Sequence, residues 1–271
     1  MTNFDPLYVI MGAVIVALLG VLSLKTKAVD KSGFLAGFFV GFSIWIFLGW
    51  QFFIVILMFH TIAAVFTHFK YDIKRRRGVA EEKGGARAWY NVLANGGLPA
   101  ILAIFEGLAK FSGMMADIFI AGFIGAVSTA CADTLATEIG LLYPSKPRLI
   151  TNLKKRVEPG TSGGVTPLGE IAIIFGSLLI GFTAYVVTAS PLLFIIALIS
   201  GFVGATFDSI LGATIQGTYR CRVCNKITEK RIHCNCETIY LRGFKVVGNN
   251  AVNFTATTIG ALTAMILFTV L

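Results

Sequence analysis

The feature that most constrains this chain is its division into long apolar blocks. About eight such blocks, each of roughly 20 residues, are separated by segments that hold nearly all of the charge. A helix of that length crosses a hydrocarbon layer about 30 Å thick, and in lipid each backbone N–H and C=O group must be satisfied within the helix. Only 14% of the residues are charged, against about 25% in an average soluble domain. We therefore expect an all-α, polytopic membrane protein.

Eight transmembrane helices are predicted from these blocks. They cover residues 8–24, 33–48, 51–68, 90–108, 114–140, 169–188, 192–212 and 251–271. The fourth is the weakest, because Gly96, Gly97 and Pro99 lie near its start, and a broken or re-entrant segment that lines a polar cavity is the alternative. The first is expected to be a retained span, because residues 1–7 lack the basic residues of a cleavable signal.

The basic residues test this topology. All but one of the 23 Lys and Arg residues fall in the loops after spans one, three, five and seven, and Lys110 is the exception. Because basic loops are retained in the cytoplasm, we expect both termini outside the cell membrane and a site that faces the cytoplasm. The larger cytoplasmic loops then cover about residues 69–89, 141–168 and 213–250. No internal repeat is evident, so residues 1–271 are expected to form a single membrane domain.

The positive charge has a simple interpretation. A net charge of +9 follows from the basic loops, which also bind anionic headgroups of the lipid bilayer, and this can account for the basic run at residues 74–77. Nucleic acid is not expected as a partner, because no recognition fold or aromatic platform accompanies the charge. The last two loops span roughly 28 and 38 residues, a length that favours a functional role in a compact protein.

Two carboxylates lie inside predicted spans, where charge is costly and usually functional. Asp133 and Asp208 each share a helical stripe with small residues, which let helix backbones approach closely, so both are expected in one cleft near the cytoplasmic end. Close carboxylates repel unless a cation lies between them, and oxygen ligands suit Mg²⁺ bound together with substrate phosphates. An interhelical hydrogen bond, or pairing with a loop Arg, is the alternative. The stripe of Asp133 also holds Ala126, Ala130, Ala136 and Gly140, and the stripe of Asp208 holds Gly201, Gly204 and Gly212.

Three other acidic residues are weaker candidates. Glu138 lies five positions after Asp133, about 140° around a helix, so it shares that face only if the helix ends first. Glu106 and Asp117 flank the outside turn near Lys110, where a solvated, interfacial role is expected.

The loop after the fifth span joins a basic run to a Gly-rich turn. Such a turn can expose successive backbone N–H groups with two hydroxyls beside them, which makes an anion nest. With the basic run just upstream, the loop looks like a phosphate cradle, although it is not a Walker A loop, and an ordinary turn is the alternative. The turn consists of Gly160, Thr161, Ser162, Gly163 and Gly164, and the run of Lys154, Lys155 and Arg156.

The cysteines of the last loop form a separate cluster. Cys221 and Cys224 have the spacing of a zinc knuckle, and His233, Cys234 and Cys236 follow. A disulfide is not expected in a reducing compartment. The cluster can therefore bind a structural Zn²⁺, and a set of free thiols in an ordered loop is the alternative.

With these motifs in place, the chain resembles the transmembrane protein 19 family of integral membrane proteins, also called domain of unknown function 92, which includes the plant phytyl-phosphate kinase. The resemblance covers most of the chain from about Gly33. The chain is more distantly similar to the dolichol and phytol kinases and to the enzymes that make CDP-diacylglycerol. The motifs that carry it are residues 94–97, 132–140, 160–166 and 208–213, together with Gln216, Asn249, Asn250 and Asn253.

The resemblance implies a membrane phosphotransferase that converts a prenyl monophosphate into a diphosphate, with a nucleoside triphosphate, CTP being favoured, as donor and Mg²⁺ as cofactor. By position, Asp133 and Asp208 would hold the metal, Lys154 and Lys155 the phosphates, and the turn at residues 160–164 the donor. Further substrate or nucleotide contacts are expected from Asn95, Thr137, Glu138, Arg156 and Gln216. The resemblance assigns no role to the cysteine cluster.

Two other functions use the same residue types. A transporter or flippase of an anionic lipid or solute fits polar residues in broken spans, although its site would lie near the bilayer midplane rather than at one face. A cytidylyltransferase that joins a nucleotide to a lipid phosphate would use the same metal and phosphate contacts. Nucleotide consumption by purified protein and the mass of the product distinguish these functions from a kinase.

Overall fold

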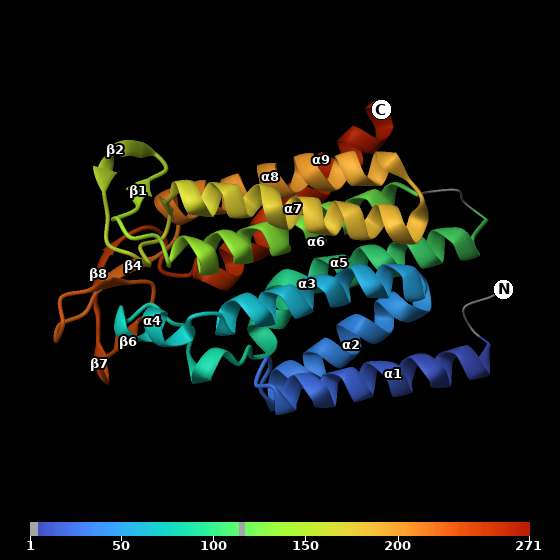
Figure 1. The fold of residues 1–271 in the computed structure, drawn as a ribbon, viewed down its shortest axis with the longest axis horizontal. Coiled ribbons are helices and arrows are strands. Elements are labelled where there is room, and N and C mark those ends of the chain that lie inside the picture. Colours follow the sequence, from blue (N-terminus) through green and yellow to red (C-terminus); the bar gives the residue numbers. More distant parts are fainter. Residues whose placement is uncertain (1–4, 114–116) are drawn as a thin grey trace.

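The chain folds into a bundle of long helices with small strands at one end. In a computed structural model that describes residues 5–113 and 117–271, eight apolar helices lie roughly along the long axis (Figure 1). They are α1 (Pro6–Lys25), α2 (Lys31–Phe47), α3 (Trp50–His68), α5 (Trp89–Phe111), α6 (Ile118–Gly140), α7 (Pro167–Thr188), α8 (Pro191–Thr214) and α9 (Asn249–Val270). Seven of them are long and apolar enough to cross a membrane, and α2 is a shorter apolar helix. The expected all-α polytopic fold is confirmed, while residues 114–116 of the predicted fifth span lie outside the described residues.

The fourth predicted span is an unbroken helix. α5 continues through Pro99 to Phe111, so the broken or re-entrant alternative is wrong. A proline removes one backbone hydrogen bond from a helix. α5 packs against α2, α6 and α9, and Gly96 and Gly107, on the two sides of Pro99, both lie against side chains of α2.

The ends of the bundle differ. α1 begins and α9 ends at the same end, and the strands gather at the opposite end, which we call the strand end (Figure 1). The basic loops after α1, α3, α6 and α8 all lie at the strand end. The separation of charge that the sequence predicted is therefore reproduced by the arrangement of the helices.

Short elements that the sequence did not predict occupy the loops of the strand end. A helix α4 (Tyr71–Arg76) and a 3₁₀ turn η1 (Lys83–Gly85) follow α3. After α6, the strands β1 (Arg148–Leu149), β2 (Asn152–Arg156) and β3 (Gly164–Val165) form an antiparallel sheet in the order β2-β1-β3. After α8, β4 (Thr218–Arg220), β5 (Ile227–Thr228) and β8 (Ile239–Arg242) form a second in the order β5-β4-β8, and β6 (Ile232–His233) pairs with β7 (Cys236–Glu237). Strands this short show no periodic pattern of apolar residues.

α6 is the centre of the bundle. It packs against α3, α5, α7, α8 and α9, and 78% of its apolar segment is buried, against 11% for α1. Small residues permit this packing, because a Cβ atom on Gly204 would lie 2.2 Å from Oγ1 of Thr129, and one on Gly260 would lie 1.9 Å from the same atom. α8 and α9 therefore both approach the backbone of α6 closely at the level of Thr129.

The contact between α6 and α9 can be tested at Gly125. A Cβ atom there would lie 2.4 Å from Cβ of Ala264 and 2.5 Å from the carbonyl oxygen of Gly260. We expect Gly125→Ala to destabilise the fold by about 1–3 kcal/mol, because neither neighbour is the end of a flexible side chain. The midpoint of thermal unfolding in detergent measures the effect. Gly37→Ala is the matched control, since no atom lies within 4 Å of its added Cβ, and equal midpoints for the two variants would contradict the close contact.

Candidate active site

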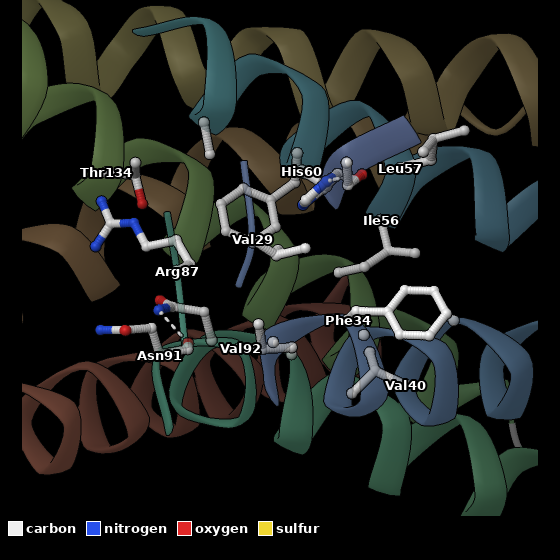
Figure 2. Close-up of a pocket in the computed structure, with 18 of the residues that line it drawn as sticks. Val29, Phe34, Val40, Ile56, Leu57, His60, Arg87, Asn91, Val92 and Thr134 are labelled. Atoms are coloured by element: carbon white, nitrogen blue, oxygen red, sulfur yellow. Dashed lines mark hydrogen bonds between the residues drawn. The ribbon is translucent and has the colours of Figure 1, made fainter. Parts of the chain in front are cut away.

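A pocket of about 240 Å³ lies among the strand-end halves of the helices. Its two parts differ in chemistry. Arg87 and Asn91 lie at one side, and Phe34 and Ile56 lie at the other (Figure 2). The apolar part is formed by α1, α2 and α3. The polar part includes Asp133, Thr134, Thr137, Asp208, Asn249 and Asn253 from α6, α8 and α9.

Asp133 and Asp208 face each other across the contact between α6 and α8. Asp133 lies one helical turn after Thr129, Asp208 lies one turn after Gly204, and the two earlier residues are in close contact. The carboxyl groups consequently come near enough to share a hydrogen bond, and both line the pocket. The structure thus brings together the two carboxylates that the sequence singled out.

Two carboxylates this close need a shared proton or a cation to offset their repulsion. Across residues 5–113 and 117–271, neither Asp133 nor Asp208 forms an ion pair with a Lys or Arg side chain. Arg87 acts on Asp133 electrostatically, but its guanidinium group pairs with Glu81 at 3.0 Å and with Glu138 at 3.3 Å. The oxygen donors that remain fit a hard divalent cation such as Mg²⁺.

Carboxamide side chains line the same pocket as the two carboxyl groups. The amide of Asn253, oriented with its nitrogen as donor, lies 3.2 Å from Oδ2 of Asp208 and 3.0 Å from the carbonyl oxygen of Asn249. Nδ2 of Asn91 donates to Oδ1 of Asn250 at 3.3 Å, which joins the start of α5 to the start of α9. Uncharged amides can contact both a carboxylate and a phosphate without adding charge. The polar part therefore combines two carboxyl groups with carboxamide groups from α5 and α9.

Of the predicted substrate contacts, Asn95, Thr137 and Glu138 line the pocket. Arg87 and Asn91 were not predicted as pocket residues, and the asparagines of α9 were predicted only as members of a motif without a role. The available signal was the gathering of Asn at the starts of two apolar helices. Asn disfavours helix interiors, so its presence there indicates a specific contact.

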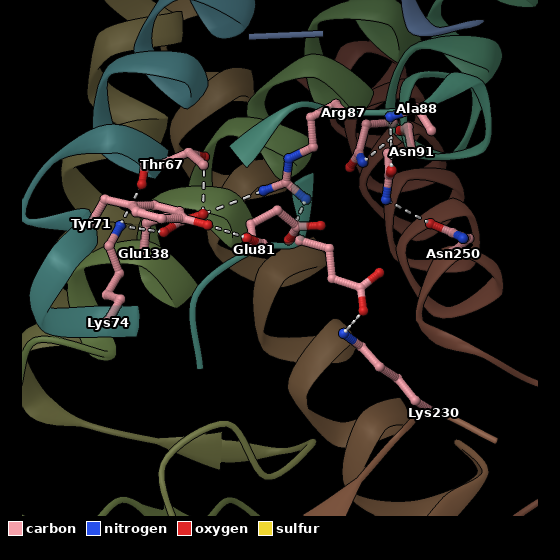
Figure 3. Close-up of polar contacts among 12 residues, drawn as sticks. Thr67, Tyr71, Lys74, Glu81, Arg87, Ala88, Asn91, Glu138, Lys230 and Asn250 are labelled. Atoms are coloured by element: carbon pink, nitrogen blue, oxygen red, sulfur yellow. Dashed lines mark hydrogen bonds and ion pairs between the residues drawn. The ribbon is translucent and has the colours of Figure 1, made fainter. Parts of the chain in front are cut away.

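Glu138 belongs to a buried ion-pair network rather than to the pair of aspartates (Figure 3). Its Oε2 atom lies 2.6 Å from Nζ of Lys74, and its Oε1 atom accepts a hydrogen bond from Thr67 at 2.9 Å. Lys74 also donates to the carbonyl oxygens of Phe66 and Thr67. The helix continues to Gly140, so Glu138 points away from Asp133 as the helical geometry predicted.

The basic run at residues 74–77 has mainly a structural role. Lys74 is only 1% exposed, and Arg77 donates to the carbonyl oxygens of Leu141 and Tyr143 at 2.7 and 3.0 Å. These bonds satisfy carbonyl groups at the end of α6. The interpretation as a headgroup-binding run is therefore wrong for Lys74 and Arg77, whereas Arg75 and Arg76 are exposed.

The predicted phosphate cradle lies at the strand end but does not line the pocket. Lys154, Lys155 and Arg156 are exposed on β2. The turn at residues 160–164 exposes fewer N–H groups than expected, because those of Thr161 and Gly164 are bonded to nearby carbonyls. Gly163 has a φ of +76°, and a Cβ atom on it would lie 2.4 Å from Cβ of Ala213. The glycine is thus required by the packing of the turn against the end of α8.

Gln216 also lies outside the pocket. Its buried side chain donates from Nε2 to Oε2 of Glu229 at 2.7 Å. Gln216 therefore ties the loop after α8 to the end of that helix.

The expectation for Glu106 was wrong. α5 extends to Phe111, so Glu106 lies on the buried face of the helix, with its side chain 0% exposed and 3.0 Å from Nζ of Lys110. Asp117 is exposed, as expected, and lies 3.6 Å from the same ammonium group. These residues are at the end of the bundle opposite to the pocket.

The buried ion pair gives a stability prediction. Glu138→Gln leaves the ammonium group of Lys74 buried without its carboxylate, and we expect a loss of about 3–5 kcal/mol. Lys74→Met should cost a similar amount, while the double variant should lose less than the sum because both charges are gone. The thermal unfolding midpoint in detergent measures each effect. Lys83→Met breaks the exposed pair with Asp30 and is the control, with an expected change below about 1 kcal/mol. Additive losses in the double variant would contradict the pairing.

Comparison with known proteins agrees with this architecture. The family model described as integral membrane protein DUF92 matches residues 14–261. Protein PGR of Arabidopsis thaliana is 32% identical over 266 residues, which cover 90% of this chain and 91% of that protein. Uncharacterized membrane protein MJ0933 of Methanocaldococcus jannaschii is 31% identical over 202 residues, which cover 74% of this chain and 81% of that protein.

A further relative lies at greater distance. Protein VTE6, chloroplastic, of Arabidopsis thaliana is 26% identical over 249 residues, which cover 90% of this chain and 66% of that protein. No solved structure matches the chain. The family match runs from within α1 to within α9 and includes both carboxylates of the pocket. The chain therefore belongs to the DUF92 family of integral membrane proteins.

Proposed function

We propose that this protein is a Mg²⁺-dependent kinase that transfers a phosphoryl group from a nucleoside triphosphate, with CTP as the first candidate, to a prenyl monophosphate. The observation that carries the proposal is the two-part pocket, with paired carboxylates at one side and an apolar channel at the other. The likeness to Protein VTE6 and the family resemblance to phytyl-phosphate kinase support the same reaction class.

The pocket matches an amphiphilic substrate. A prenyl chain is apolar along its length, so it gains free energy from contact with the walls that α1, α2 and α3 contribute. Its phosphate then reaches the polar part, where Arg87 and the second N–H bond of the Asn91 amide can donate hydrogen bonds to it. One molecule with an apolar tail and an anionic head fills both parts.

The carboxylates account for the need for a metal. Asp133 and Asp208 would hold Mg²⁺, which when bound neutralises charge on the transferring phosphoryl group. Asn253 positions the carboxylate of Asp208 through its amide. The expected arrangement relies on positioning and charge rather than on a covalent intermediate.

The acceptor needs little activation. The second pKa of a phosphate monoester is about 6, so a terminal oxygen of the prenyl phosphate is already ionised near neutral pH. That oxygen attacks the γ-phosphorus, the bond to the β–γ bridging oxygen breaks, and the nucleoside diphosphate leaves. A dedicated general base is not required, which suits a pocket whose central acidic groups serve as metal ligands.

The donor would approach from the strand end. The exposed residues Lys154, Lys155 and Arg156 on β2 lie at that end, together with the turn at residues 160–164. Cationic side chains there can contact the phosphates of a nucleotide whose γ-phosphate enters the polar part. If the strand end faces the cytoplasm, as the basic loops predict, the donor comes from the cytoplasmic nucleotide pool.

The reaction is tested with purified protein, Mg²⁺, phytyl or geranylgeranyl monophosphate and each nucleoside triphosphate in turn. Mass spectrometry of the lipid should show a gain of one phosphate that disappears with EDTA. Asp133→Asn and Asp208→Asn should each lower the rate by at least about 100-fold, because each removes a charge from the metal site. Asp117→Asn, at the opposite end of the bundle, is the matched control. Full turnover by Asp133→Asn would exclude it as a metal ligand, and a lipid product that gains a nucleotide would indicate a cytidylyltransferase.

The apolar part of the pocket is tested separately at Gly37. This residue lines the pocket, and no atom lies within 4 Å of a Cβ atom built on it. We expect Gly37→Leu to project into the channel and to lower kcat/KM for geranylgeranyl monophosphate on the order of 10-fold more than for geranyl monophosphate. An equal effect on both substrates would show that the prenyl tail does not occupy this part of the pocket.

A further inference from the structure

The loop after α8 brings four potential metal ligands together. The Sγ atoms of Cys221, Cys224 and Cys234 and a ring nitrogen of His233 all lie within 4.8 Å of one another. No disulfide joins these cysteines. Cys221 and Cys224 lie in the turn between β4 and β5, whereas His233 ends β6 and Cys234 begins the turn that leads to β7. Their convergence is therefore a property of the fold and not only of sequence spacing.

The first turn has the backbone of a metal-binding knuckle. The N–H groups of Val223 and Cys224 both point at Sγ of Cys221, at 3.4 and 3.5 Å. The N–H group of Cys221 donates to the carbonyl oxygen of Lys226, which closes the turn, and Asn225 takes a φ of +58°. Backbone N–H groups aimed at a sulfur atom stabilise its thiolate form, which is the form that ligates a metal.

The second turn completes a tetrahedral set. Nδ1 of His233 lies 3.6 Å from Sγ of Cys224 and 3.3 Å from Sγ of Cys234. Zn–S bonds of about 2.3 Å and Zn–N bonds of about 2.0 Å place tetrahedral ligands roughly 3.5 Å apart. Cys236, although only two positions further along, lies on β7, is exposed and is not a member of the group.

The segment that carries these residues has little else to hold it together. Its strands are two to four residues long, and between residues 218 and 242 the buried positions are Thr218, Tyr219 and Cys221. Apolar side chains such as Val223 and Ile232 are exposed, at 62% and 67%. A segment that buries so few side chains does not offset its loss of conformational entropy without a cross-link or a metal.

We propose that Cys221, Cys224, Cys234 and His233, the last through Nδ1, bind one structural Zn²⁺. The donor set is three sulfur atoms and one imidazole with no carboxylate, which favours Zn²⁺ over the hard cations. Four protein ligands leave no open position, so the ion is structural and takes no part in the chemistry of the pocket.

The segment at residues 218–242, which carries the proposed zinc ligands, lies against the loop between α3 and α5. Lys226 donates to the carbonyl oxygen of Arg77 at 3.1 Å, and Lys230 pairs with Glu82 at 2.5 Å (Figure 3). Glu82 is the neighbour in sequence of Glu81, which lines the pocket and holds Arg87. By ordering the loop after α8, the zinc ion therefore also holds the loop after α3, whose Glu81 lines the polar part of the pocket. Its loss should loosen both loops while the helices remain packed.

The first test is the metal content of the full chain. Protein purified in detergent under reducing conditions, without an affinity tag, should contain about one zinc ion per chain by inductively coupled plasma mass spectrometry. Cobalt added to the zinc-free protein should give the intense visible absorption of a tetrahedral site and a thiolate charge-transfer band. No zinc and no such spectrum from protein that is monodisperse would overturn the proposal, as would a disulfide between Cys224 and Cys234 in freshly reduced and repurified protein.

The variants identify the ligands. Cys224→Ser and Cys234→Ser should lose the zinc and make the loop sensitive to limited proteolysis between residues 218 and 242, with the helical bundle intact by size exclusion. Cys236→Ser is the matched control and should keep the zinc and the protease resistance. His233→Cys should also keep the zinc, because a fourth thiolate replaces the imidazole. Loss of zinc in Cys236→Ser with retention in Cys234→Ser would overturn the assigned ligand set. Kinase activity is not the readout, so this result is independent of the proposed function.

Discussion

The close contact of α6 with α8 and α9 around Thr129 is the constraint on which the pocket depends. Gly204 and Gly260 bring two helices to the same side chain, because a Cβ atom on either would overlap Oγ1 of Thr129. One turn further along, the same contact holds Asp133 against Asp208. A wider helix separation would move the two carboxyl groups apart and break the hydrogen bond between them. Small residues thus set the distance between the two carboxyl groups of the pocket.

Charged groups at the strand end divide into two sets. One set forms contacts within the protein that join the loop after α3 to the end of α6, and it consists of Lys74, Arg77 and Glu138. Asp133 and Asp208 have no cationic side chain paired with them in the described part of the chain. A buried charge that is already paired supports the fold, whereas two adjacent carboxyl groups without a cationic partner either share a proton or bind a cation. Burial alone does not distinguish these roles, but the partners do.

Much of the fold and part of the site could be predicted from the sequence. The spans were predictable because the bilayer imposes length and apolar character on each helix, and Asp133 and Asp208 stood out because charge is rare in such segments. The small-residue stripes correctly indicated a close approach of helices. The ion pair between Lys74 and Glu138 was not predictable, since residues 64 positions apart carry no sign of contact in one sequence. Nor were the strands, which are held by pairing and by turns rather than by a repeating pattern.

The walls of the pocket differ in how firmly they are held. α6 is enclosed by five other helices, whereas α1, which supplies part of the apolar wall, has 11% of its apolar segment buried, the lowest share among the candidate spans. Displacing a helix with few internal contacts costs little packing free energy, because surrounding hydrocarbon replaces the contacts that are lost. The wall that α1 contributes can therefore move more easily than the walls formed by α2, α3 and α6. Widening of the pocket would therefore take place by displacement of α1 toward the bilayer, while α6 keeps its position.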